Sequence, residues 1–134
     1  EQLAVRHVEA GEERTVEGKG GALTLKPFLV DHGKTPALGY RFAGAAYSPD
    51  MNDIPRQSLG LLQDLDVWII DGLRYAPHPS HTNIDQALAW IELMKPVTAV
   101  ITNMHSDLDY ETLRAQLPPH VEPAYDGIGV TLSS

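Results

Sequence analysis

The hydrophobic pattern of this chain changes its period near residue 54, and this change constrains the fold most strongly. Before that point, apolar and polar residues alternate in short runs, as in half-buried strands. After it, residues at helical spacing separate two apolar runs, 66–71 and 97–102, which are typical of strands buried on both faces. Strands followed by a β-α-β-α-β order predict an α+β fold, in which an antiparallel sheet continues into a mixed sheet with outer helices.

The same patterns place the individual elements. Thr82 and Asp85 resemble a capping box at a helix start, and Pro27 indicates an edge strand or a bulge. Trp68 and Trp90 are expected in the core. We expect strands over 3–8, 22–30, 38–42, 45–47, 66–71, 97–102 and 130–132, with a polar, glycine-rich loop or long hairpin connection over 11–21. A short helical segment is expected over 54–62, and helices over 82–94 and 109–117.

Composition excludes several classes of protein. The 134 residues suit one domain, and the absence of cysteine excludes disulfide scaffolds, thiolate metal sites and cysteine nucleophiles. Ten Lys and Arg against eighteen Asp and Glu give a net charge of −8, which makes a long nucleic acid an unfavourable partner. No apolar run reaches the roughly 18 residues of a membrane span, and no signal peptide is visible. We therefore expect a cytoplasmic protein without a membrane partner.

Three polar residues follow predicted strands at positions where α/β folds build sites. Asp50 follows the strand at 45–47, His81 follows the 66–71 strand after a loop, and His105 follows the 97–102 strand. An aspartate and two histidines that converge could bind a borderline metal such as zinc. The alternative is that each histidine is a loop residue making an ordinary hydrogen bond, and spacing alone leaves both interpretations open.

Other polar residues are expected to have structural roles. Asp64, Asp66 and Asp71 are expected at solvated strand ends, and Asp107 and Asp109 at the N-cap of the last helix. No G-x-S-x-G elbow occurs, which disfavours a serine nucleophile. The remaining histidines are expected in a loop (His78) or at the surface (His7 and His120).

Several stretches together resemble the metallo-β-lactamase superfamily. They are 28–33 (FLVDHG) with 38–42 (LGYRF), 47–50 (YSPD), 65–72 (LDVWIIDG) with 81–84 (HTNI), 101–110 (ITNMHSDLDY) and 124–127 (AYDG). In order and spacing they are similar to the second half of its phosphodiesterase branch, to which the cyclic-phosphate phosphodiesterase of phosphonate breakdown belongs. The resemblance covers about residues 22–132.

The resemblance implies a role for five residues. Asp50 would bridge two divalent metal ions, zinc or manganese, and His105 would ligate the second one. His81 would face the substrate phosphate as an oxyanion partner or general acid. Asp126 would orient a metal-ligating side chain without binding the metal itself, and His32 would line the pocket. Metal-activated water would then attack a phosphoester.

The family's principal metal motif, H-x-H-x-D-H, does not occur in this sequence. We therefore expect residues 1–134 to be a single partial domain, the C-terminal half of an αββα sandwich, with an incomplete metal site. An N-terminal half or a second copy would complete it, and an exposed sheet face favours a homodimer. The expected function is a phosphodiesterase acting on a small phosphoester. The alternatives are a non-catalytic fragment or another hydrolase of the superfamily, such as a nuclease or thioesterase.

Overall fold

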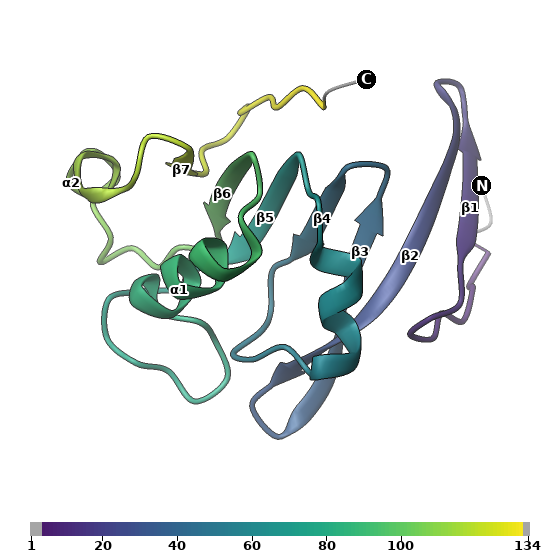
Figure 1. The fold of residues 1–134 in the computed structure, drawn as a ribbon, viewed down its shortest axis with the longest axis horizontal. Helices are drawn as coiled ribbons and strands as arrows, with labels where there is room; N and C mark the ends of the chain where they lie inside the picture. The colour runs from purple at the N-terminus through teal and green to yellow at the C-terminus, as the bar shows by residue number, and fades with distance from the viewer. Residues whose placement is uncertain (1–3, 133–134) are drawn as a thin grey trace.

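The computed structural model describes residues 4–132, and a single seven-stranded sheet organises them (Figure 1). The strands lie side by side in chain order, from β1 to β7. Their bounds are β1 (Arg14–Gly18), β2 (Gly21–His32), β3 (Thr35–Phe42), β4 (Ala45–Ser48), β5 (Val67–Asp71), β6 (Thr98–Thr102) and β7 (Val121–Pro123), with a 3-10 helix η1 (Arg56–Leu62) and the helices α1 (Ile84–Met94) and α2 (Tyr110–Gln116) between them.

The direction of pairing changes in the middle of the sheet. Strands β1 to β4 pair antiparallel, whereas β4 to β7 pair parallel. The connections agree with this change, because tight turns join the antiparallel strands and longer crossovers, one of them α1, join the parallel ones. The expected α+β class and mixed sheet are confirmed.

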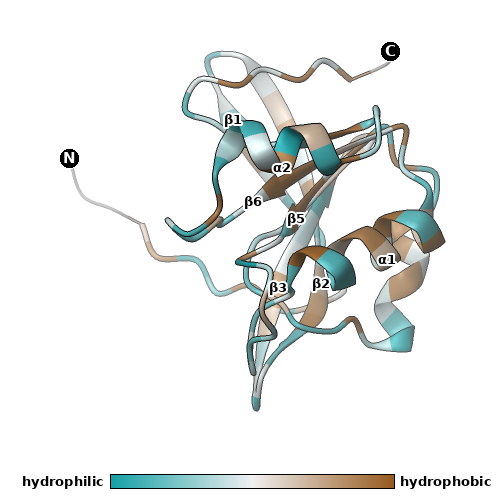
Figure 2. Cartoon of the chain, turned by 90° about the vertical axis from the view of Figure 1, so that its left-hand side faces the viewer, coloured by the Kyte–Doolittle hydropathy of each residue, from teal (hydrophilic) through white to brown (hydrophobic). Residues whose placement is uncertain are grey.

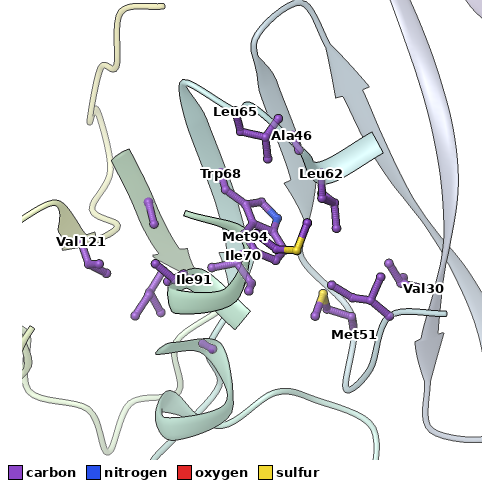
Figure 3. Close-up of a cluster of buried hydrophobic side chains, with 14 of the residues drawn as sticks. Val30, Ala46, Met51, Leu62, Leu65, Trp68, Ile70, Ile91, Met94 and Val121 are labelled. Carbon is purple, nitrogen blue, oxygen red and sulfur yellow. The ribbon is translucent and has the colours of Figure 1, made fainter. Parts of the chain in front are cut away.

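One face of the sheet carries the hydrophobic core. Helix α1 packs on this face, as Figure 2 shows, and its buried residues recur at helical spacing. Trp68 and Ile70 of β5 are fully buried beneath it, together with Leu62 of η1 (Figure 3). Trp68 also donates its indole N–H to Ser48 Oγ at 2.9 Å, so its polar atom is satisfied within the core. Trp90 is only partly buried and packs against this cluster.

Helix α1 begins one residue later than its expected cap. Asn83 is the N-cap and forms a capping box with Gln86, whereas we expected Thr82 and Asp85 in these roles. Thr82 is instead fully buried, and its hydroxyl donates to the Met51 carbonyl at 2.7 Å. Thr82 thus holds the preceding loop against the 49–55 segment. The helix ends at Met94, and its C-cap residue Lys95 adopts a left-handed conformation before Pro96.

Three expected elements are wrong. Residue 3 lies outside the described residues, and residues 4–8 form no strand. The expected 11–21 loop contains β1, which pairs with β2 in a hairpin; both faces of β1 are exposed, so no buried alternation marks it as a strand. Residues 130–132 form no strand either. The last strand is β7, which is only three residues long and is defined by pairing with β6.

The other element predictions hold to within a few residues. Asp109 caps α2 by accepting the Thr112 N–H at 2.8 Å, as expected. His7 and His120 are exposed. None of the helices in the described part of the chain is long and apolar enough to cross a membrane.

Candidate active site

The three central strands bring the expected site residues to one edge of the sheet. Strands β4, β5 and β6 run parallel, so their C-terminal ends lie next to each other. Asp50 follows β4, Asp71 ends β5, and Asn103 and His105 follow β6. The edge therefore gathers two carboxylates, an amide and an imidazole from segments far apart in the sequence.

Asp71 is at the centre of this edge. It is fully buried, and its carboxylate accepts hydrogen bonds from His81 Nδ1 at 2.7 Å, the Met51 backbone N–H at 3.2 Å and Asn103 Nδ2 at 3.3 Å. Burial raises the pKa of this carboxyl, against the lowering effect of the bonds from His81 and Met51. The expectation of a solvated strand end is wrong, because protein N–H groups take the place of water around the carboxylate.

The bond to Asp71 fixes the orientation of the His81 ring. With Nδ1 bound to the carboxylate, Nε2 is the ring nitrogen left for another partner. The same Nδ1 lies 3.9 Å from Asp50 Oδ1, and the Asp50 side chain is 57% exposed against 17% for His81. Two of the three residues proposed from strand ends, Asp50 and His81, are therefore neighbours.

Two further imidazoles surround His81. The His32 ring centroid lies 4.6 Å away and the His78 centroid 5.0 Å away. His32 Nδ1 donates to the Ser80 carbonyl at 2.7 Å, which ties the β2–β3 turn to the loop that carries His81. That turn needs Gly33, whose φ of +67° is left-handed and whose added Cβ would lie 3.0 Å from the Ser80 Cβ.

His105 stands apart from this cluster. Its backbone N–H donates to the Leu73 carbonyl at 2.7 Å, which fixes it beside the loop after β5. Its Nδ1 bonds to the Asp107 carboxylate, and both side chains are more than half exposed. The bond from His105 is the main reason that the pKa of Asp107 is lowered. Asp107 is therefore the partner of His105 and not the expected helix N-cap.

In the described part of the chain, Asp126 makes no hydrogen bond to the other candidate residues, although it shares a cavity with Asn103 of the site edge. It lines a cavity of about 750 Å³ on the sheet face opposite α1, together with Asn103 and Met104 at one end. Within residues 4–132 no hydrogen bond joins it to His105 or Asp50. Its expected role behind a metal ligand thus has no contact to support it in this chain.

The donor set for a metal ion is incomplete in the described part of the chain. Asp50 and His105 offer the carboxylate and imidazole donors that divalent zinc and manganese take. Across residues 4–132, however, no three His, Asp or Glu side chains are grouped so that they could hold a metal ion. These residues therefore fit at most a part of a metal site.

Sequence reasoning missed Asp71 and Asn103. Asp66 and Asp71 flank the same apolar run, so their positions in the sequence did not show which of the two is part of the site. Asn103 adopts φ +59°, and its amide also donates to the Pro49 carbonyl at 3.3 Å. Asparagine tolerates the left-handed region better than most residues, and this preference was the one available signal for Asn103.

Comparison with known families gives a match over most of the chain. Residues 1–105 match the family model described as "Beta-lactamase superfamily domain". A curated relative, an octanoyltransferase of Porphyromonas gingivalis (strain ATCC BAA-308 / W83), is 37% identical over 109 residues, which cover 79% of this chain and 22% of that protein.

Two solved structures are similar in fold. A diphosphatase from the PhnP family has a TM-score of 0.87 and 33% identity, covering 95% of this chain and 49% of that one. Zinc-bound PqqB from Methylobacterium extorquens has a TM-score of 0.66 and 15% identity, covering 93% of this chain and 55% of that one. The chain thus spans about a fifth of the curated relative and about half of the diphosphatase.

Proposed function

Because this chain belongs to the β-lactamase superfamily domain family and has the metallo-β-lactamase fold of its hydrolases, we propose that it forms part of a metal-dependent phosphodiesterase. The resemblance drawn from the sequence motifs is confirmed at the level of family and fold. The substrate proposed is a small phosphoester. Support comes from the 33% identical structure, which is named as a diphosphatase. The octanoyltransferase suggests no activity here, because the match covers only 22% of that protein.

The observation that carries the proposal is the half-buried His81 held by the fully buried Asp71. Asp71 holds Nδ1 of the imidazole, so that Nε2 is the atom available to the substrate. When Nε2 also carries a proton, an imidazole fixed in this way can donate that proton to the leaving oxygen of a phosphoester, while the Nδ1 proton stays with Asp71. Met51 and Asn103 hold the carboxylate in turn, so the proton donor is in place before substrate binds.

Asp50 and His105 are proposed as this chain's share of a site for two divalent metal ions. Zinc or manganese would supply Lewis acidity and an activated water when bound. PqqB, of similar fold, holds zinc. Because the described residues form no complete donor set, the other ligands must come from outside residues 4–132. An N-terminal half of a longer protein or a second copy of the chain could provide them.

The sheet face opposite α1 is proposed as the surface on which that partner packs. Phe42, Ile69 and Val100 line the large cavity on this face, and Tyr47 on the neighbouring strand is 40% exposed. Apolar side chains gathered on one open face favour association. We expect the isolated chain to form a homodimer through this face, and light scattering at high concentration should give twice the monomer mass. A monomer at all concentrations would contradict the dimer.

Hydrolysis of bis(p-nitrophenyl) phosphate tests the proposed activity. The chain is assayed with zinc or manganese, first alone and then with an N-terminal half of the 33% identical diphosphatase supplied as a separate polypeptide. We expect metal-dependent release of nitrophenol in at least one of these arrangements. The control is the same mixture with Asp50→Ala in this chain, which should be inactive.

The incomplete donor set favours one alternative, a non-catalytic module that keeps the fold for assembly. No hydrolysis with any added metal or partner half would support the module and overturn the phosphodiesterase. Metal content after dialysis against metal-free buffer is the quickest first indication. About two ions per chain would support the enzyme, and none would show that the site needs a partner.

A further inference from the structure

His78 lies beside the proposed proton donor, although its position in a proline-rich loop gave no sign of function. Its ring is half-buried, and its centroid is 5.0 Å from that of His81. The loop around it is held internally, because Arg74 donates to the carbonyls of Ala76 at 3.2 Å and Pro77 at 2.8 Å. His78 is thus presented to the site edge by a preorganised loop.

The hydrogen-bond partners determine where each neighbouring imidazole carries its proton. The Ser80 backbone N–H donates to His78 Nδ1 at 3.3 Å, so His78 accepts at Nδ1 and carries its proton on Nε2. His32 is the reverse, because its Nδ1 donates to the Ser80 carbonyl and leaves Nε2 as an acceptor. His81 also uses Nδ1 as the donor, to Asp71.

His78 is therefore the one ring of these three that presents an N–H at Nε2 while neutral. Desolvation, followed by the nearby Arg74 guanidinium and His81, lowers the pKa of His78 and favours this neutral form. Within residues 4–132, every buried side-chain nitrogen and oxygen has a hydrogen-bond partner. His78 Nε2 bonds to no group of these residues, so it is not one of the buried atoms. His78 Nε2 is therefore at least partly exposed to solvent, in a ring whose centroid lies 5.0 Å from that of His81.

We propose that His78 binds the substrate by donating its Nε2–H to a non-bridging oxygen of the phosphoryl group, while His81 protonates the leaving oxygen. This inference rests on the proposed phosphodiesterase function. No bond to His78 forms or breaks, and its proton stays on Nε2 throughout. A neutral donor at this place stabilises the growing negative charge on phosphoryl oxygen without competing for the proton that His81 delivers.

Two amide substitutions separate this role from a purely structural one. In His78→Asn, the amide oxygen takes the place of Nδ1 and keeps an acceptor for Ser80, but the Nε2 donor is lost. In His78→Gln, the amide nitrogen takes the place of Nε2 and keeps the donor, but the Ser80 acceptor is lost. His120→Asn, at an exposed position, is the matched surface control.

The first readout is kcat/KM for bis(p-nitrophenyl) phosphate in whichever arrangement of the wild-type protein is active. We expect a loss of about tenfold or more in kcat/KM for His78→Asn, mainly in kcat, because the donor acts most strongly on the transition state. His120→Asn should remain within about threefold of the wild type, and His78→Gln should lose less kcat/KM than His78→Asn because it keeps the donor. Equal activity of His78→Asn and wild type would overturn the inference and leave the phosphodiesterase proposal intact.

The second readout does not depend on turnover. Inorganic phosphate is titrated into the full chain labelled with ¹⁵N-histidine, and the imidazole nitrogens are followed by NMR. We expect the His78 Nε2 resonance to move on saturation with phosphate while the His120 resonances stay in place. If the wild type hydrolyses no phosphodiester, the proposed function fails, yet a moving His78 resonance still supports the anion contact. A stationary His78 resonance overturns it.

Discussion

The molecule contains two histidine–aspartate pairs that are chemically alike and physically different. In the inner pair, His81 and Asp71, the side chains are 17% and 0% exposed. In the outer pair, His105 and Asp107, they are 59% and 60% exposed. The inner carboxylate also accepts two further N–H donors, from Met51 and Asn103. The outer one is held mainly by its histidine.

This difference indicates that the two pairs contribute to different properties. Removing the inner carboxylate leaves buried donors without an acceptor, so the inner pair supports both the fold and the orientation of His81. The outer pair sits in water, where such a contact adds little stability. Its exposure leaves His105 free to meet a ligand supplied from outside the described residues.

The largest effect should come from removing the exposed imidazole. We expect His105→Ala to abolish metal-dependent hydrolysis of bis(p-nitrophenyl) phosphate, because the proposed metal site loses a ligand. Stability to urea should not change, since the side chain is mostly exposed. Metal content by elemental analysis should fall in parallel with activity. Retained metal and activity would show that the outer pair has no role in the site.

His81→Ala should lower turnover by about a hundredfold or more, through loss of a general acid. Metal content should stay at the wild-type level, since Asp71 and not a metal is assigned to Nδ1. His81→Gln is the matched control for bulk and should be as slow as His81→Ala. Loss of metal in His81→Ala would show instead that His81 is a ligand, and the contrast between the pairs would disappear.

Asp71→Ala should destabilise the fold by about 3 kcal/mol, because His81 Nδ1 and the Met51 N–H lose their acceptor and each such loss costs about 1 to 3 kcal/mol. Urea denaturation followed by circular dichroism measures this as a lower midpoint. Asp71→Asn keeps the shape and one acceptor oxygen and should lose less stability. If Asp71→Ala were as stable as the wild type, the inner carboxylate could not be the centre of the edge.

Asp107→Ala should have the smallest effect. The stability of the chain should be unchanged within error, because both partners of the outer pair are exposed. Metal affinity should weaken by about tenfold, since Asp107 orients the His105 ring from its Nδ1 side. Titration with zinc in competition with a chelating dye measures the affinity. A loss of stability comparable to that of Asp71→Ala would contradict the distinction between the pairs.

The site was only partly visible in the sequence. Asp50, His81 and His105 were singled out because each follows a strand that periodicity could locate. Asp71 was misjudged because its burial depends on Met51, His81 and Asn103, which lie 20, 10 and 32 residues away in the chain. The role of Asp126 was assigned through resemblance and stays a prediction: the residue lines a cavity that also reaches Asn103.

Regular repeats of apolar residues were enough to locate most of the central elements. Alternation defined β2 and β3, unbroken apolar runs defined β5 and β6, and helical spacing defined α1, because in each case one face must be buried. Tertiary structure alone decided β1 and β7. The first is exposed on both faces, and the second is three residues long and exists through its pairing with β6. Tertiary structure also decided the chemistry of Asp71, because only packing from distant segments removes water from its carboxylate.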